Sequence, residues 1–160
     1  MKNVSRFIKK SDPIKDTFVF KLPDYWPSRK YEYAWAAEFI EPNDVSLDAA
    51  CGLCHPLKFH LLDSGNQTFA CDLDQRILSE EKIRAEISEV YGEESNLSFS
   101  KTYFEKIDYK IASLTELPYK DQFFNKVYCI SVLEHLNDKF NKYPVLLKIP
   151  FLQKFLDRDI

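Results

Sequence analysis

Segments that favour β-strand and segments that favour α-helix alternate along the middle of the chain, and this order constrains the fold more than any other feature of the sequence. Helices placed between strands imply crossover connections, and crossovers join parallel strands. The sequence therefore predicts an α/β fold with a doubly wound, mostly parallel sheet of about four strands. The segments expected to form these strands are residues 45–49, 67–71, 109–112 and 126–131.

Three helices are expected before and between these strands. One covers residues 31–40 and must end before Pro42, because the residue before a proline is pushed out of the helical region. A second begins at Pro56, a residue suited to the first helical position, and Gly65 ends it. The third is capped by Ser79 and terminated by Gly92, and Glu80 and Arg84 lie at i,i+4 spacing within it.

The chain is expected to form one main domain with two appendages. Residues 1–42 form a basic and aromatic lead-in that is partly helical, residues 43–136 form the core of the fold, and residues 137–160 form a short apolar helical tail. If the sheet stops at residues 126–131, that strand becomes an exposed edge. We expect the tail to cover this edge, either within the chain or across a homodimer.

Charge and composition exclude several classes of protein. The net charge of -3 divides into +5 for residues 1–30 and -8 for residues 31–160, so the body of the protein is acidic and we expect no nucleic-acid partner. No apolar run approaches the roughly 18 to 20 residues that a membrane span needs, and no secretory signal is visible, so we expect a cytoplasmic protein. The three glycines, where average usage gives about 11, predict that any phosphate or cofactor loop departs from a glycine-rich pattern.

Residues 45–54 read VSLDAACGLC and resemble the first motif of the Rossmann-like, S-adenosylmethionine-dependent methyltransferases, whose pattern is close to V-L-D-x-G-x-G-x-G. Asp48 and Gly52 match this pattern. Ala50 and Cys54 stand where the family has its first and third glycines. The resemblance is closest to the methyltransferase type 11 domain.

Further segments match the family in the same order along the chain. Residues 69–74 (FACDLD) resemble the acidic end of its second strand, residues 113–127 (SLTELPYKDQFFNKV) resemble D-A-x-x-L-P-F-x-D-x-x-F-D-x-V, and residues 131–136 (SVLEHL) resemble the end of its fourth strand. Residues 26–33 (WPSRKYEY) are similar to a segment that some of these enzymes place over the cofactor. The resemblance stops near residue 136, before the L-K-P-G-G turn and the last three strands of the family, so a truncated fold is expected.

The resemblance implies an S-adenosylmethionine site and a methyl transfer to a small-molecule acceptor. A carboxylate at Asp72 suits the two ribose hydroxyls of the cofactor. His135 is the best-placed general base or substrate contact. The residues expected to bind the cofactor are Asp48, Ala50, Cys51, Gly52, Asp72, Leu73, Ser113 and Leu114, and those expected to gate the substrate are Tyr31, Tyr33 and Trp35.

Two alternatives remain beside an active methyltransferase. The first is a non-catalytic or truncated relic that binds the cofactor. The second is a cytosolic thiol-redox protein, because Cys51-Gly-Leu-Cys54-His55 fits a C-x-x-C pattern at a strand-to-helix turn, where a helix N-terminus lowers a thiol pKa. The same residues fit a haem-attachment pattern, but such proteins are normally exported. A zinc site at these cysteines lacks a second close pair of ligands, so no metal is expected.

Overall fold

The computed structural model describes residues 8–132 of the chain. Its strands are β1 (Thr17–Phe18), β2 (Phe20–Lys21), β3 (Val45–Ala49), β4 (Gln67–Asp72), β5 (Asp108–Ile111) and β6 (Lys126–Tyr128). Its helices are α1 (Arg29–Ala37), α2 (Leu57–Asp63), the 3₁₀ turn η1 (Gln75–Leu78), α3 (Glu80–Tyr91), α4 (Glu93–Ser98) and α5 (Thr102–Lys106). The expected tail, residues 137–160, lies outside the described residues.

Four strands form a parallel sheet in the order β5-β4-β3-β6, which confirms the predicted α/β class. β1 and β2 pair separately as a short antiparallel hairpin. From β3 the chain adds β4 and then β5 on one side of the sheet, whereas β6 is added on the other side of β3. The strand order therefore reverses between β3 and β6. Ligands in open α/β sheets bind beyond the carboxyl ends of the strands at such a reversal.

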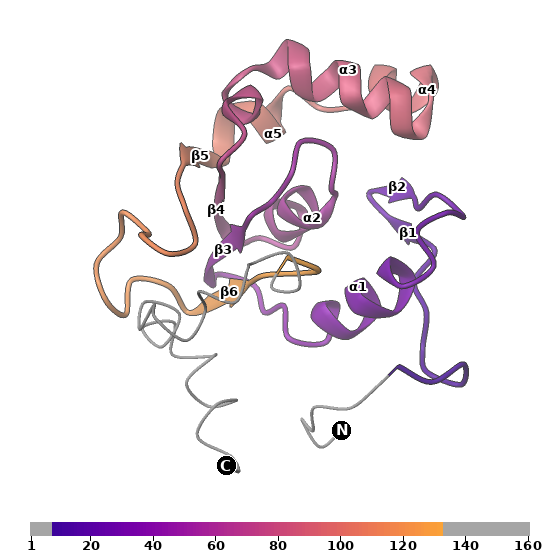
Figure 1. The fold of residues 1–160 in the computed structure, drawn as a ribbon, viewed down its shortest axis with the longest axis horizontal. Helices are drawn as coiled ribbons and strands as arrows, with labels where there is room; N and C mark the ends of the chain where they lie inside the picture. The colour runs from indigo at the N-terminus through magenta and orange to yellow at the C-terminus, as the bar shows by residue number, and fades with distance from the viewer. Residues whose placement is uncertain (1–7, 133–160) are drawn as a thin grey trace.

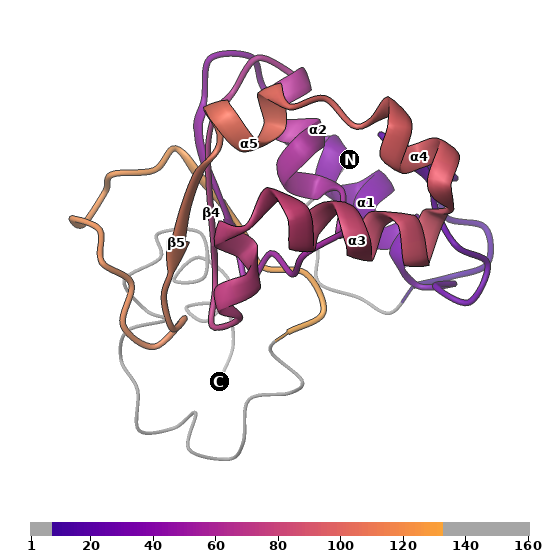
Figure 2. The same cartoon turned by 90° about the horizontal axis from the view of Figure 1, so that it is seen from above.

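The two faces of the sheet are covered by different parts of the chain. In Figures 1 and 2 the labelled helices lie on one side of β4 and β5, whereas the orange connection between β5 and β6 lies on the other side. Alternation along each strand explains this division, because successive side chains point to opposite faces. Leu47 and Phe69 pack with Leu114 from the connection, while Ala70 packs against the helical side with Ile83 and Ile87 of α3.

The lead-in packs into the same core. Phe18 of β1 is fully buried with Tyr33 of α1 and with Leu57 and Leu61 of α2. Phe20 of β2 joins the aromatic cluster around α2 and α5. The hairpin and α1 thus hold one another against α2, on the helical side of the sheet. None of the helices between residues 8 and 132 is long and apolar enough to cross a membrane.

Several predicted boundaries need correction. α1 begins at Arg29, before the predicted start at residue 31. It ends before the predicted residue 40, because the amides of Glu38, Phe39 and Ile40 bond three residues back in a tighter turn instead of continuing the α-helix. β6 ends at Tyr128, not at residue 131. Tyr128 pairs with Asp48, and beyond this point β3 turns away at Ala50, which leaves the end of β6 without its partner.

Candidate functional site

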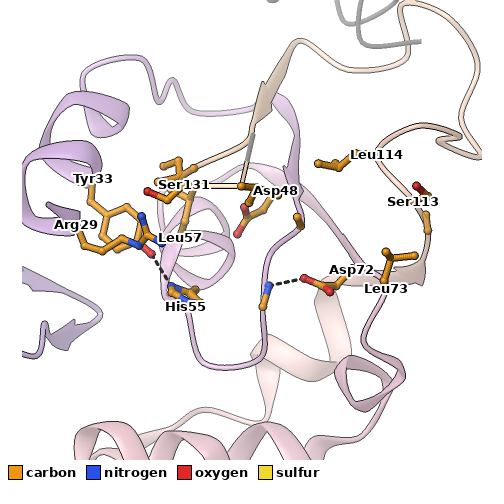
Figure 3. A pocket seen from close by; sticks show the side chains of 15 residues that line it. Arg29, Tyr33, Asp48, His55, Leu57, Asp72, Leu73, Ser113, Leu114 and Ser131 are labelled. Atoms are coloured by element: carbon orange, nitrogen blue, oxygen red, sulfur yellow. Dashed lines mark hydrogen bonds between the residues drawn. The ribbon is translucent and has the colours of Figure 1, made fainter. Parts of the chain in front are cut away.

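A cavity of about 300 Å³ lies at the carboxyl end of the sheet, beside the reversal of strand order. Figure 3 shows Arg29, Tyr33 and His55 on one side of it and Asp72, Leu73 and Ser113 on the other. Each strand of the sheet contributes residues from its end or from the loop that follows. The lining residues are Arg29, Tyr33, Asp48, Ala50, Gly52, His55, Leu57, Asp72, Leu73, Ala112, Ser113, Leu114, Ile130, Ser131 and Val132.

Asp48 places a buried carboxylate at the centre of the site. It is the fourth residue of β3 and its side chain points to the helical side of the sheet, so it is only 4% exposed. Its Oδ2 atom has no hydrogen-bond partner in the part of the chain that the structure describes. Burial raises the pKa of Asp48 to about 6, although the nearby charge of Lys58 acts in the opposite direction. A buried carboxylate oxygen without a partner suits a cationic or hydrogen-bond-donating ligand.

Asp72 is the second carboxylate of the cavity, at the end of β4. One oxygen, Oδ2, accepts a hydrogen bond from the Gly52 amide at 2.8 Å, and the other, Oδ1, accepts one from the Asp74 amide at 3.0 Å. An ionised carboxylate has about four acceptor positions. Two of them therefore stay available to a ligand. Leu73 beside it is 70% exposed, which gives the cavity an apolar rim.

The loop after β3 has two residues with positive φ, but only one of them is a glycine. Both Ala50 (φ 57°) and Gly52 (φ 55°) lie in the left-handed region. That conformation costs an L-residue about 1–2 kcal/mol, a cost that Gly52 avoids and Ala50 does not. A Cβ at Gly52 would also lie 2.6 Å from Cδ2 of His55, so no larger residue fits there without moving the imidazole.

Two polar contacts connect α1 to the site. The Tyr33 hydroxyl lies 3.1 Å from Nδ1 of His55, whose ring also stacks on Trp26 with centroids 4.6 Å apart. Glu32 pairs with Arg29 at 2.6 Å and accepts hydrogen bonds from the Ser131 hydroxyl at 2.9 and 3.0 Å. α1 is thereby fixed both to the loop after β3 and to the segment after β6.

The titratable groups around the imidazole are poor proton donors and acceptors near neutral pH. Burial lowers the pKa of His55 to about 3, with the charges of Lys58 and Arg29 acting in the same direction. Burial likewise raises the pKa of Tyr33 well above its usual value. His55 and Tyr33 are therefore suited to holding reactants in position and not to acid or base catalysis.

The structure brings most of the predicted site residues together. All of the expected cofactor residues except Cys51 line the cavity, and Cys51 instead places its side chain in the core. Of the expected gate, Tyr33 lines the cavity, while Tyr31 is not among the lining residues and Trp35 is 45% exposed and packs on Phe39. His135 lies outside the described residues, so its role stays a prediction.

The cysteine pair has the wrong environment for a reactive thiol. Cys51 and Cys54 are 2% and 3% exposed. Burial raises the pKa of Cys54 to about 11 and that of Cys51 further, so neither thiol ionises readily near neutral pH. Residues 8–132 contain no group of three or more His, Cys, Asp or Glu side chains placed to hold a metal ion. The burial of the two thiols weighs against the redox alternative.

Sequence reasoning missed Arg29, Ser131 and the buried Lys58. The first two fall inside segments that resemble family motifs, and a signal for Ser131 existed. The carboxyl ends of neighbouring parallel strands meet at one edge of a sheet, so residues just after the last predicted strand belong at the site. Arg29 lies within residues 26–33, the segment expected over the cofactor, but which side chain of that segment reaches the cavity depends on how α1 packs.

Comparison with known proteins shows which protein family the chain matches. The family model described as "Methyltransferase domain" matches residues 47–143, which is more than half of the chain. No curated protein matches the sequence.

Solved structures similar to the chain include three from different organisms. A protein from Methanococcus maripaludis assigned as an S-adenosyl-L-methionine-dependent methyltransferase has a TM-score of 0.50 at 13% identity, covering 74% of this chain and 48% of that one. A TehB-like SAM-dependent methyltransferase from Corynebacterium glutamicum has a TM-score of 0.49 at 16% identity, covering 73% and 53%. Magnesium protoporphyrin IX methyltransferase from Synechocystis with bound SAH has a TM-score of 0.41 at 20% identity, covering 65% and 40%.

At these identities the Methanococcus maripaludis likeness shows a shared fold and nothing finer. The chain spans about half the length of the solved structures it matches.

Proposed function

The chain belongs to the methyltransferase domain family, and from this premise we propose that it binds S-adenosylmethionine and transfers the methyl group to a small-molecule acceptor. The observation that carries the proposal is the pair of carboxylates at the ends of β3 and β4. Asp48 and Asp72 line one cavity beside the reversal of strand order, where a nucleotide-like ligand is expected.

The cavity residues fit such a cofactor at each of its ends. The unpaired Oδ2 of buried Asp48 would accept a hydrogen bond from the ammonium group of the methionine part. The two unused acceptor positions of Asp72 would take the ribose hydroxyls. Leu73 and Leu114, with Ser113 between β5 and the connection, would contact the adenine. A cavity of about 300 Å³ lies at the lower end of the range for small-molecule sites.

The bound cofactor would supply an electrophilic methyl group on a sulfonium. The contribution of the protein is then to orient that methyl group and to exclude water around it, and proximity alone accounts for a large part of such acceleration. The depressed pKa of His55 agrees with a reaction that needs little help from an acid or a base in this part of the site. His135 remains our candidate for a substrate contact.

Calorimetry with S-adenosylmethionine and S-adenosylhomocysteine tests the proposal. We expect both to bind, and we expect Asp72→Ala to weaken binding by roughly 1 to 3 kcal/mol, or about 5- to 150-fold, through loss of charge-assisted hydrogen bonds. Asp121→Ala changes an exposed carboxylate that is not among the cavity residues and serves as the matched control. Failure of the unaltered protein to bind at millimolar ligand would refute the proposal. Binding without turnover against a panel of acceptors would instead favour the non-catalytic alternative.

A further inference from the structure

Lys58 is the most deeply buried charged residue of the described chain, at 0% exposure in the second position of α2. Lysine is almost never fully buried unless its charge has partners. Its Nζ atom donates hydrogen bonds to three backbone carbonyl oxygens, those of Cys51 at 3.2 Å, Gly52 at 2.9 Å and His55 at 2.7 Å. An ammonium group has three N–H donors, and all three are used here.

The three acceptors belong to the loop after β3 that lines the cavity. This loop runs through Gly52 in the left-handed region and then enters α2, and the hydrogen bonds of Lys58 go to carbonyl groups along it. Buried carbonyl groups without a partner are costly. Lys58, at the start of the helix that follows the loop, donates to these carbonyl groups through its ammonium group.

One of these bonds connects Lys58 to the cavity carboxylate. The carbonyl of Cys51 and the amide of Gly52 belong to the same planar peptide unit and point in opposite directions. The carbonyl edge accepts from Lys58, and the amide edge donates to Oδ2 of Asp72 at 2.8 Å, a bond drawn as a dashed line in Figure 3. The peptide between Cys51 and Gly52 is therefore held from both sides, by a cation and by a carboxylate.

We propose that Lys58 is a positioning residue for cofactor binding, which orients the Asp72 carboxylate through the Cys51–Gly52 peptide. The inference rests on the proposed function, because the ligand it serves is S-adenosylmethionine. Lys58 itself is not among the residues that line the cavity, so it acts through residues that do: on Asp72 through the peptide, and on Asp48 as a nearby charge. The family pattern has glycines where this loop has Ala50 and Cys54. In this loop, the buried ammonium group of Lys58 fixes the orientation of the Cys51–Gly52 peptide.

The test compares Lys58→Met with a control on the same helix. Methionine keeps a long unbranched side chain and removes the three donors. Leu61→Ala also removes buried contacts from α2, but Leu61 is fully buried in the cluster with Phe18 and Tyr33 and does not line the cavity. If Lys58→Met does not fold, Lys58→Gln takes its place, because glutamine removes the charge and one of the three donors, and the same directions of change are expected in affinity and in the Gly52 signal described below. We expect Lys58→Met to weaken S-adenosylhomocysteine binding at least tenfold, and Leu61→Ala to lower the melting temperature with affinity unchanged within twofold.

A spectroscopic readout separates positioning from general stability. The chain has only three glycines, so selective ¹⁵N-glycine labelling gives three backbone signals, of which that of Gly52 is assigned from triple-resonance spectra. An amide that donates to a carboxylate resonates downfield. The Gly52 signal should move upfield in both Lys58→Met and Asp72→Ala, while the signals of Gly65 and Gly92 stay in place. In Leu61→Ala all three should stay in place.

A double-substitution cycle decides whether Lys58 acts through Asp72, and it is run in the Asp48→Asn background so that the charge of Lys58 no longer acts on an Asp48 carboxylate. If it does, adding Lys58→Met to Asp72→Ala should weaken binding by less than threefold beyond Asp72→Ala alone, because coupled residues do not contribute independently. Independent losses that multiply, or a Gly52 signal that does not move in Lys58→Met, would overturn the proposal. If the unaltered protein binds no S-adenosylhomocysteine, the proposed function fails, whereas the glycine spectra still test the link from Lys58 to Asp72.

Discussion

Replacing Asp48 by asparagine should make the protein more stable at neutral pH and a poorer binder of its ligand. The carboxyl group is 4% exposed and its Oδ2 atom lacks a partner, so ionisation in the folded state is unfavourable. Burial accordingly raises the pKa of Asp48 from its ordinary value of 3.8 to about 6. Asparagine has nearly the same shape and does not ionise.

The sign and size of the effect follow from these two pKa values. Between about pH 4 and pH 6 the folded state keeps a proton on Asp48 that the unfolded chain has released, so stability falls as the pH rises through this window. Each unit of pKa difference corresponds to about 1.4 kcal/mol, which gives a total loss of about 3 kcal/mol above pH 6. Asp48→Asn removes this loss. The difference in unfolding free energy between variant and unaltered protein should therefore rise by about 3 kcal/mol from pH 4 to pH 6 and stay level above it.

Urea unfolding of both proteins at half-unit intervals from pH 4 to pH 8 measures this difference. Asp121→Asn provides the same chemical change at an exposed position as the control. Calorimetry at pH 7.5 should show that Asp48→Asn binds S-adenosylmethionine more weakly, since a hydrogen bond to a charged group contributes about 1.5–3 kcal/mol. A difference in unfolding free energy that does not vary with pH would refute the argument from burial.

Three further outcomes are expected. Gly52→Ala should lower the free energy of unfolding by about 1–2 kcal/mol from its φ of 55° alone, with the contact to His55 adding to this, and urea unfolding with an unchanged midpoint would contradict it. A thiol reagent at pH 7 should label Cys51 and Cys54 only as fast as the chain unfolds, because both are buried with raised pKa values, whereas rapid labelling would support the redox alternative. Deleting residues 144–160, which lie outside the described residues, should give an insoluble or dye-binding product, and a soluble, cooperatively unfolding one would show that the tail is dispensable.

Local signals were sufficient for the long regular elements. The third helix begins after Ser79, whose hydroxyl accepts from the Lys82 amide, and ends at Gly92 with a φ of 88°. Glu80 and Arg84 form the expected ion pair at 2.8 Å. Each of these features depends on residues within one or two turns of one another, so the sequence alone contains them.

Elements that depend on distant packing were not predictable. β1 and β2 have two residues each and are joined by Val19 at a φ of 67°, so they are too short to show an alternating pattern. α4 and α5, of six and five residues, are likewise too short for a helical period. The hairpin exists because Phe18 and Phe20 find places in two clusters around α2.

In the candidate site, too, the residues that belong to local motifs were predictable and those that depend on the folded backbone were not. Asp48 and Asp72 were predictable because a motif places each carboxylate at the end of a strand. The role of Lys58 was not, since its partners are backbone carbonyls whose direction depends on the conformation of the loop. A single lysine in a short segment has no feature in the sequence that distinguishes it from a solvated one.

The pairing of β3 with both neighbours has a consequence for the order of folding. Ser46 aligns with Thr68 of β4 but with Lys126 of β6, and the bond from the Val45 amide to Asn125 spans 80 residues. Closing the longer loop costs roughly 1 kcal/mol more chain entropy than closing the shorter one, so the contact with β6 should form after the pairing of β3 with β4. During synthesis, β3, β4 and β5 leave the ribosome before β6, and the wall of the cavity formed by Ile130, Ser131 and Val132 is the last to arrive. Binding of a ligand to this cavity would then report that β6 has joined the sheet.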